Sequence, residues 1–329
     1  RRVQIEFVSA NPTGPLVVVN ARAAAVGDSL ARILAAQGDR VFREYYVNDA
    51  GNQVQILARS LEIRIRQQRG EVAELPEESY PGEYLVELAK EYLSTEGPAV
   101  LGAPEDERLD RLGVFAVMRI TEGQRRVLSA YGVEFDNWFS ERALREGGKP
   151  PRVLERLRER GFVYDAEGAA WFRSTAFGDD KDRVLVKSDG EATYFVNDIA
   201  YHVDKIERGF ERLIDLYGPD HHGHVLRMQA ALKALGYPDG ILDILIIQLV
   251  TLLREGQPVR MSKRMGEFVT MEELIGEVGR DAARFTFLTR RHDSPLDFDL
   301  EVVTRQTAEN PVYYVQYAHA RIASIFQHL

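Results

Sequence analysis

The chain has 329 residues, of which 45% are hydrophobic and 28% charged, and it carries a formal net charge of −9 with no cysteine. This composition is typical of a soluble globular protein with one large or two to three ordinary domains, and it excludes disulfides, thiolate metal sites and cysteine nucleophiles. The negative charge argues against indiscriminate binding to nucleic acid. Because no stretch resembles a signal peptide or reaches the ~20 apolar residues of a membrane span, we expect a cytoplasmic protein.

The first 50 residues read as a strand, a tight loop, a helix and a second strand. Residues 3–8 are an apolar run, residues 11–15 are rich in Pro and Gly, and residues 21–37 show apolar side chains at helical spacing. Residues 41–47 are β-branched and aromatic, which is typical of a strand. This order predicts a βαβ unit with parallel strands and therefore an α/β nucleotide-binding sheet.

Residues from about 60 to 190 change in character. Charged helical stretches run to about Leu128, and alternating stretches such as residues 170–172 and 183–187 follow, separated by Gly and Asp. The Gly- and Pro-rich run at residues 147–151 is the strongest interruption of the chain. The pattern predicts an inserted α+β segment.

The strand pattern returns after this insertion. Residues 213–217 and 244–247 are buried-strand runs with a helix over about 224–235 between them, and helical patterns cover 272–275, 282–285 and 312–326. We therefore predict an α/β fold with a split, Rossmann-like parallel sheet, an inserted α+β segment and a helical C-terminal extension. The expected boundaries are 1–60 and 191–270 for the two halves of the sheet domain, 61–190 for the insertion, 271–307 for a helical segment and 308–329 for the opening of a further helical domain.

The loop after the first strand is the first candidate site. Gly14 and Pro15 lie in a turn that leads into a helix N-terminus, where unpaired N–H groups and the helix dipole favour a phosphate or carboxylate. An ordinary connection between strand and helix is an equally good interpretation of this loop alone.

A second candidate is the cationic, Gly-terminated loop at residues 260–266. Lys263 could stabilise charge that develops at the α-phosphate of a nucleotide, assisted by Arg260 and Ser262. Two wider concentrations of Arg and Lys, at residues 142–160 and 280–291, are interpreted as solvated helix faces in preference to nucleic-acid contacts.

The residues Met261, Ser262 and Lys263 resemble the KMSKS signature of class I aminoacyl-tRNA synthetases, in the order expected after a split Rossmann sheet. Six segments that together span nearly the whole chain resemble the arginyl-tRNA synthetases in particular. These segments are residues 5–15, 46–53, 135–138, 194–201, 218–223 and 264–270.

The resemblance implies a binding site for arginine. Glu6 and Asp198 fall on positions that the family uses to hold the arginine substrate, so the resemblance implies that their side chains anchor it. A carboxylate that contacts a guanidinium in bidentate fashion would distinguish arginine from lysine. Structural hydrogen bonding at strand ends is the alternative role for both carboxylates. The remaining implied arginine contacts are Ser9, Asn11, Tyr194 and one of two adjacent histidines, for which we take His222, while His221 stays open.

The histidine-rich stretch at residues 220–224 also invites a metal hypothesis, since imidazole and carboxylate are good zinc ligands. Adjacent histidines point in different directions, and no further ligand group is evident. We therefore predict no metal site in the protein itself.

The resemblance fails at one motif. Where the family carries the HIGH signature, with two histidines and a glycine, this chain has Val17, Val18, Val19 and Asn20. The histidines stabilise charge on the ATP phosphates, and the valines supply neither donors nor the space that glycine leaves. An engineered change, a natural loss of catalysis and a misread sequence are three competing explanations.

The implied activity is that of the catalytic region of an arginine–tRNA ligase, which forms arginyl-adenylate from arginine and ATP and passes arginine to the 3′ end of tRNA(Arg). Gly14, Pro15, Asn20, Met261 and Lys263 would bind ATP, with Mg²⁺ accompanying the nucleotide and no tightly bound cofactor. We expect a monomer whose activity is impaired by the altered motif and by the absence of the family's flanking domains. The alternative is a catalytically inactive binding protein or an engineered knock-out fragment.

Overall fold

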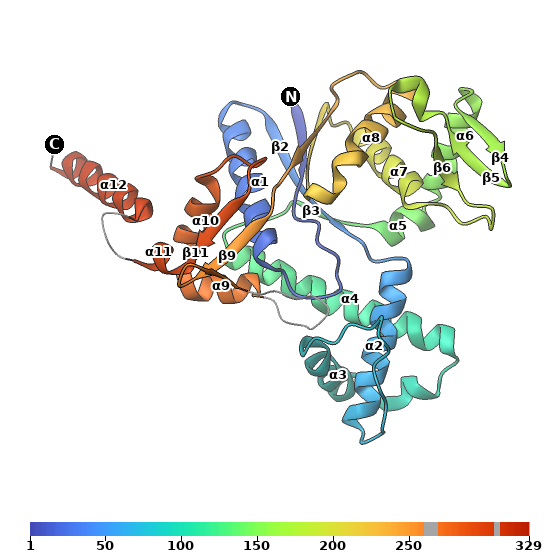
Figure 1. Cartoon of the computed structure of the whole chain (residues 1–329), viewed down its shortest axis with the longest axis horizontal. Coiled ribbons are helices and arrows are strands. Elements are labelled where there is room, and N and C mark those ends of the chain that lie inside the picture. The colour runs from blue at the N-terminus through green and yellow to red at the C-terminus, as the bar shows by residue number, and fades with distance from the viewer. Residues whose placement is uncertain (260–268, 306–309, 329) are drawn as a thin grey trace. The chain divides into compact units, whose positions relative to one another are not determined.

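The computed structural model describes residues 1–259, 269–305 and 310–328. Internal contacts divide the chain into two compact units, each assembled from three segments (Figure 1). Unit one consists of Arg1–Ser9, Ser29–Ala50 and Phe135–Ile247, and unit two consists of Ala10–Asp28, Gly51–Glu134 and Gln248–Leu329. Among the described residues, no helix is both long enough and apolar enough to cross a membrane.

A five-stranded parallel sheet forms the centre of unit one, with strand order β3-β2-β1-β7-β8. Val3 of β1 pairs with Val41 on one side and with Arg212 on the other, so β1 is the middle strand. The strands on one side of β1 come from before residue 141 and those on the other side from beyond residue 210, which confirms the predicted split sheet. The strands are β1 (Arg2–Glu6), β2 (Arg40–Val47), β3 (Asn137–Ser140), β7 (Arg212–Tyr217) and β8 (Leu242–Ile246).

Strand β3 was not expected in this sheet, because the sequence placed it inside the inserted segment at 61–190. The strand has only four residues, and it pairs with β2 in a register that sets Glu44 opposite Asn137. Tyr45 of β2 stacks on Trp138 at a ring-centroid distance of 4.2 Å, which fixes the edge strand in place. The segment 61–190 is therefore divided between the two units.

The rest of unit one packs helices and a small antiparallel sheet around one core. Phe195 and Ile199 of α7, Leu157 of α6 and Phe172 of β5 are buried in this core. The antiparallel sheet, with order β4-β5-β6, is the strand-rich part that the alternating sequence predicted. The elements are α5 (Glu141–Glu146), α6 (Lys149–Glu159), β4 (Val163–Ala166), β5 (Ala169–Phe172), η2 (Ser174–Phe177), β6 (Arg183–Val186), α7 (Tyr194–Glu207), η3 (Pro219–His221) and α8 (His222–Ala234).

Helices dominate the first part of unit two (Figure 1). Gly113 of α4 lies where an added Cβ would come within 3.0 Å of Val54 Cγ1, so the missing side chain lets α2 and α4 approach closely. Helix α1 spans Val18–Ala36, and its residues 18–28 belong to this unit. The other helices are α2 (Asn52–Gln68), α3 (Tyr84–Thr95), η1 (Pro98–Gly102) and α4 (Glu105–Ala130).

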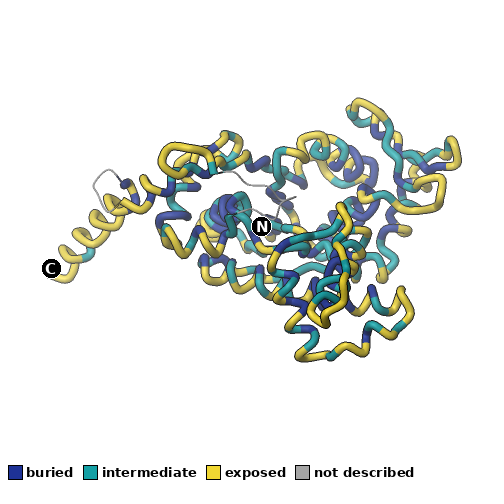
Figure 2. The backbone as a smooth tube through the Cα atoms, turned by 60° about the horizontal axis from the view of Figure 1, so that its bottom comes forward, coloured by how far each residue is buried: buried dark blue, intermediate teal, exposed yellow. Residues whose placement is uncertain are grey.

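The second part of unit two begins with the three-stranded sheet β10-β9-β11. Residues 271–307, expected to be helical, also contain β11, which pairs in parallel with β9. Thr270 and Glu273 form a reciprocal capping box at the start of α9. Figure 2 shows α12 exposed along nearly all of its length. The elements are β9 (Val250–Arg254), β10 (Gln257–Pro258), α9 (Met271–Val278), α10 (Arg280–Leu288), β11 (Leu296–Asp299), α11 (Leu300–Thr304) and α12 (Pro311–Gln327).

Arg22, on α1, connects three parts of unit two that are distant in sequence. Its side chain is completely buried, and its guanidinium donates hydrogen bonds to four backbone carbonyl oxygens at 2.8–3.3 Å. The acceptors are the carbonyls of Gln248, Leu249, Arg291 and Ser294. Arg22 therefore satisfies backbone carbonyls of two separate loops, and one of these carbonyls, Leu249 O, also accepts the Leu296 N–H of β11.

We expect Arg22→Met to lower the free energy of unfolding by about 2–3 kcal/mol, because the buried carbonyls lose a charged donor while the apolar volume is kept. Urea denaturation measures the change. Arg32→Met is the matched control, since Arg32 lies on the same helix and is exposed. An equal loss of stability in both variants would contradict the role given to Arg22.

Candidate active site

The backbone at the end of β1 is strained. Ser9 N–H donates to Phe7 O at 3.0 Å across Val8, which has φ of 69°, so the chain turns sharply through a three-residue γ-turn with positive φ. Val8 is β-branched and Ser9 also has a positive φ of 39°, conformations that L-residues rarely adopt. Strain of this kind is held by the surrounding structure and is concentrated at functional sites.

This turn places the Ser9 side chain between two strands. Ser9 Oγ donates to Glu6 Oε1 at 2.9 Å and accepts the Tyr46 N–H of β2 at 3.1 Å. The turn therefore fixes the carboxylate of Glu6 at the carboxyl edge of the sheet, where ligands bind in open α/β folds.

Glu6 meets a buried lysine on its other side. Lys205 Nζ, fully buried, donates to Glu6 Oε2 at 2.7 Å and to Asp215 Oδ1 at 2.8 Å. The pKa of Lys205 is raised because both carboxylates outweigh burial, and the pKa of Asp215 is held well below its usual range by Lys205. Burial raises the pKa of Glu6, and Lys205 offsets this only in part.

The expected role of Glu6 as an open carboxylate anchor differs from this geometry. Glu6 is 4% exposed, and its two oxygens already accept from Ser9 and Lys205. Glu6 therefore orders the floor of the site and presents no free oxygen pair for a bidentate contact.

His202 continues the buried network. Its Nε2 lies 2.7 Å from Asp215 Oδ2 and its Nδ1 lies 2.7 Å from the carbonyl oxygen of Asp198. The network thus joins Lys205 and His202, both on α7, to the buried carboxylates of Glu6 and Asp215.

Helix α7 contains both buried residues of this network and residues that are exposed at the surface. Tyr194 and Asp198 are four residues apart, so they share one face of the helix, and the same stripe continues to His202 and Lys205. Tyr194 is 57% exposed, and Asp198 keeps 35% of its side-chain surface accessible. Asp198 is therefore the carboxylate of this stripe that a ligand can reach.

The surroundings of Asp198 disfavour its charge. Burial, followed by the nearby carboxylates of Glu141 and Glu6, raises the pKa of Asp198 to about 8. His224 Nε2 lies 3.3 Å from Asp198 Oδ2, but burial lowers the pKa of His224 to about 3, so this ring is neutral and does not compensate a carboxylate. The arrangement favours a cationic ligand that supplies the missing charge.

The predicted histidine assignment also changes. His222 is exposed at the start of α8, and His221 keeps 53% of its side chain accessible. His224, one turn into α8, packs against the rings of Phe195 and Tyr217 and faces Asp198. The sequence shows the histidine-rich stretch at residues 220–224, but the order of residues along the chain could not show which histidine side chain points inward.

The second part of the predicted site lies in unit two. Tyr84 OH donates to Thr13 O at 2.5 Å, and Gln124 Nε2 donates to Gly14 O at 3.0 Å, so α3 and α4 hold the Pro- and Gly-rich loop. Asn11 and Pro15 are exposed in this loop. The predicted loop residues thus lie together before α1, as the strand, loop and helix pattern required.

The altered motif has a definite local structure. Asn20 Oδ1 accepts the Val17 N–H at 2.9 Å, which caps the N-terminus of α1 from within the helix. Val17 pairs with Thr270 in an isolated bridge, and Val18 is buried with 1% exposure. The side-chain amide of Asn20 is therefore the one polar donor that residues 17–20 offer through their side chains.

Some predicted features remain outside this description. Arg260, Met261, Ser262 and Lys263 lie outside the described residues. Within the described ranges, no group of three or more His, Asp or Glu side chains could hold a metal ion.

The two concentrations of cationic residues are largely paired within the protein. In the first, Lys149 pairs with Asp204, and Arg158 pairs with Asp165 at 2.7 Å. In the second, Arg291 pairs with Asp293 at 2.7 Å. These contacts pair cations of both concentrations within the protein; Lys149 and Arg158 lie on α6, whereas Arg291 follows the end of α10.

Comparison with known proteins decides the family. A family model described as tRNA synthetases class I (R), catalytic domain, matches residues 137–326. The solved structure of a Campylobacter jejuni protein assigned to the arginyl-tRNA synthetases is similar, with a TM-score of 0.91 and 38% identity, over 100% of this chain and 72% of that one. This chain belongs to the arginyl-tRNA synthetase family.

Other relatives agree with this membership. A curated arginine–tRNA ligase of Desulforamulus reducens is 53% identical over 329 residues, which make up 100% of this chain and 59% of that protein. The Thermus thermophilus arginyl-tRNA synthetase shares the fold, with a TM-score of 0.77 at 22% identity, over 100% of this chain and 65% of that one. The chain thus spans about 59% of the length of its curated relative and corresponds to the synthetase catalytic region.

Proposed function

We propose that this chain binds arginine through Asp198 and activates it with ATP to arginyl-adenylate, which then passes arginine to tRNA(Arg), and that the altered motif slows activation. The proposal rests on one observation: the Asp198 carboxylate is accessible and lies near two other carboxylates, those of Glu141 and Glu6, with no cation paired to it among the described residues. A guanidinium presents paired donors in a plane and matches a carboxylate that lacks a cation.

The residues proposed to bind arginine through its side chain all lie in unit one. Tyr194 and Asp198 stand on one face of α7, while Glu6, Ser9 and Lys205 form a fixed floor at the strand ends. An ammonium cannot fill both oxygens of Asp198, so arginine is preferred over lysine. Asn11 contributes at the polar end of the amino acid.

The nucleotide side follows from the loop at Gly14 and Pro15 and from the start of α1, where helix N–H groups favour phosphate. Asn20 donates to the nucleotide, Mg²⁺ accompanies its phosphates, and Met261 belongs to the same ATP-binding set. Lys263, with Arg260 and Ser262, supplies charge in the transition state.

A second candidate function is arginine binding without activation. The geometry of residues 17–20 favours it, because Val17 uses its N–H for Asn20 and its side chain offers no donor. The two candidates share the arginine site and differ in whether the chain turns over ATP.

The arginine site is tested by calorimetric titration of arginine between pH 6 and 9. Because the pKa of Asp198 is about 8, the empty site is mostly protonated at neutral pH, and a guanidinium must displace that proton. Affinity should rise about tenfold per pH unit up to about pH 8 and then level, with proton release visible in buffers of different ionisation enthalpy.

Asp198→Asn is the decisive variant of this experiment. We expect it to weaken arginine binding by about 1.5–3 kcal/mol, a moderate loss because the carboxylate is partly exposed to water. The variant should also abolish the pH dependence and the proton release. A pH-independent affinity in the parent chain would remove Asp198 from the proposed role.

A further inference from the structure

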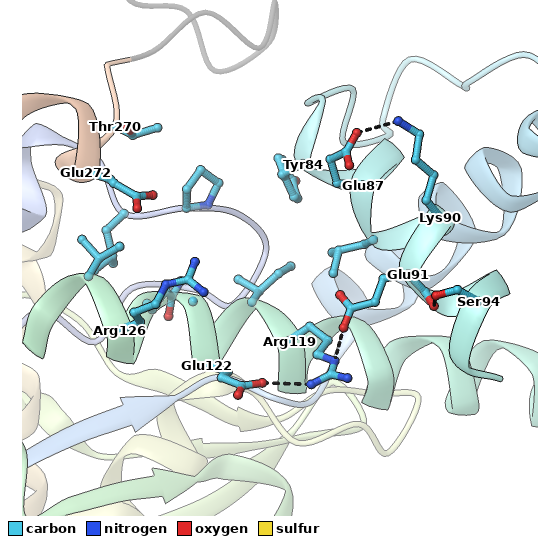
Figure 3. A pocket seen from close by; sticks show the side chains of 17 residues that line it. Tyr84, Glu87, Lys90, Glu91, Ser94, Arg119, Glu122, Arg126, Thr270 and Glu272 are labelled. Carbon is cyan, nitrogen blue, oxygen red and sulfur yellow. Dashed lines mark hydrogen bonds and ion pairs between the residues drawn. The ribbon is translucent and has the colours of Figure 1, made fainter. Parts of the chain in front are cut away.

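A cavity of about 910 Å³ lies within unit two, apart from the Asp198 site (Figure 3). One face of α4 lines it through residues at helical spacing, including Ile120 and Val127, and α3 contributes Leu88. Leu16 and Tyr84 complete an apolar floor. The volume is at the upper end of the range of small-molecule sites, which are typically apolar with a few placed polar groups.

Most of the charges around this cavity are already paired. Arg119 Nε lies 2.9 Å from Glu91 and its NH1 lies 3.0 Å from Glu122, and Lys90 Nζ lies 2.7 Å from Glu87, as Figure 3 shows. These five side chains carry one net negative charge, because Arg119 is shared by two carboxylates.

Two lining residues of opposite sign differ from the rest. Arg126 of α4 and Glu272 of α9 both line the cavity, and the side chain of neither forms an ion pair or hydrogen bond with any residue that the structure describes. Figure 3 shows both side chains at the same end of the cavity. A ligand with a single charge would match one of them and leave the other unpaired, whereas a zwitterion matches both.

The cavity also touches the loop that precedes α1. Tyr84 and Gln124 line it, and the same two side chains donate to the carbonyls of Thr13 and Gly14. Leu16, whose carbonyl accepts the Met271 N–H at 2.8 Å, forms part of the wall. A bound ligand would therefore contact the side chains of Tyr84 and Gln124, whose hydrogen bonds hold the loop at Thr13 and Gly14.

We propose that this cavity binds an apolar amino acid or short peptide with free amino and carboxyl groups, the carboxylate meeting Arg126, the ammonium meeting Glu272 and the side chains covering Leu88, Ile120 and Val127. Binding tightens the loop at Thr13 and Gly14 and thereby regulates the site that begins at α1. The binding itself requires neither ATP nor arginine.

The test is a calorimetric titration of the dipeptide Leu-Phe into the whole chain, with phenylalanine and the doubly blocked acetyl-Leu-Phe-amide as parallel probes. Leu-Phe should bind saturably, and the blocked peptide at least tenfold more weakly. Arg126→Gln and Glu272→Gln should each weaken Leu-Phe at least tenfold. Arg125→Gln, which changes the neighbouring residue outside the lining, should leave binding unchanged.

Hydrogen exchange adds a readout that needs no variant. Amides of residues 13, 14, 16 and 17 and of 270–272 should exchange more slowly when Leu-Phe is bound, while those of α8 stay unchanged. Absence of saturable binding by Leu-Phe and phenylalanine, equal affinity for the blocked peptide, or binding that is insensitive to both charge variants would each overturn the proposal. None of these outcomes bears on arginine binding at Asp198, so the two proposals fail separately.

Discussion

Restoring the altered motif with Val17→His, Val19→Gly and Asn20→His is expected to raise the rate of arginine activation by at least about a thousandfold. One preorganised donor near developing phosphate charge contributes about 2.7–4 kcal/mol, or roughly 10²–10³ in rate, and the change introduces two such donors. The replacement of Val19 also opens the approach of the nucleotide to the backbone. Val18 is kept because it is buried.

The measurement is arginine-dependent exchange of pyrophosphate into ATP in the presence of tRNA(Arg), with arginine omitted as the blank. Val19→Ala alone is the matched control, since it frees space without adding donors, and it should raise the rate only slightly. The restored chain loses the contact from Asn20 Oδ1 to the Val17 N–H and gains a glycine in the first turn of α1, so its fold must be checked by circular dichroism. A folded, restored chain that is no faster than the parent would show that residues 17–20 do not limit activation.

Lys205→Met is expected to destabilise the protein by about 3–5 kcal/mol, because it leaves the carboxylates of Glu6 and Asp215 buried without their shared cation. Urea denaturation at pH 7 measures this loss. The triple variant Lys205→Met, Glu6→Gln, Asp215→Asn removes the unpaired charges and should recover most of the stability.

The effect of Lys205→Met on stability should also depend on pH in a definite direction. In the parent chain the pKa of Asp215 is depressed, so its stabilising contribution is complete above its unfolded pKa of about 4 and is lost as the pH falls below that. In Lys205→Met the carboxylates gain by protonation, so the difference between variant and parent should shrink as the pH falls from 7 to 4. A difference that stays constant with pH would mean that the loss comes from packing.

The strand and helix pattern of the sequence was sufficient for the general fold. Short buried runs around Val3, Val41 and Leu213 predicted strands, and the tight loop before α1 was evident from its Pro and Gly residues. These signals are local, because side-chain periodicity and turn chemistry depend on neighbours within a few residues. The four-residue strand β3 has no such periodicity, and only its pairing with β2 identifies it.

The family motifs likewise located Asp198 and Tyr194, and helix periodicity alone would place both on one face of α7. The sequence alone therefore determined the family and the parallel sheet, and it named Glu6 and Asp198 as equal candidates without showing which carboxylate is accessible. Only the tertiary structure decided that Glu6 is occupied by Lys205, 199 residues away, and that His224 is the histidine facing Asp198. The reason is physical: the charge and accessibility of a buried group depend on partners that the fold brings together over long sequence distances, and no local pattern records those partners.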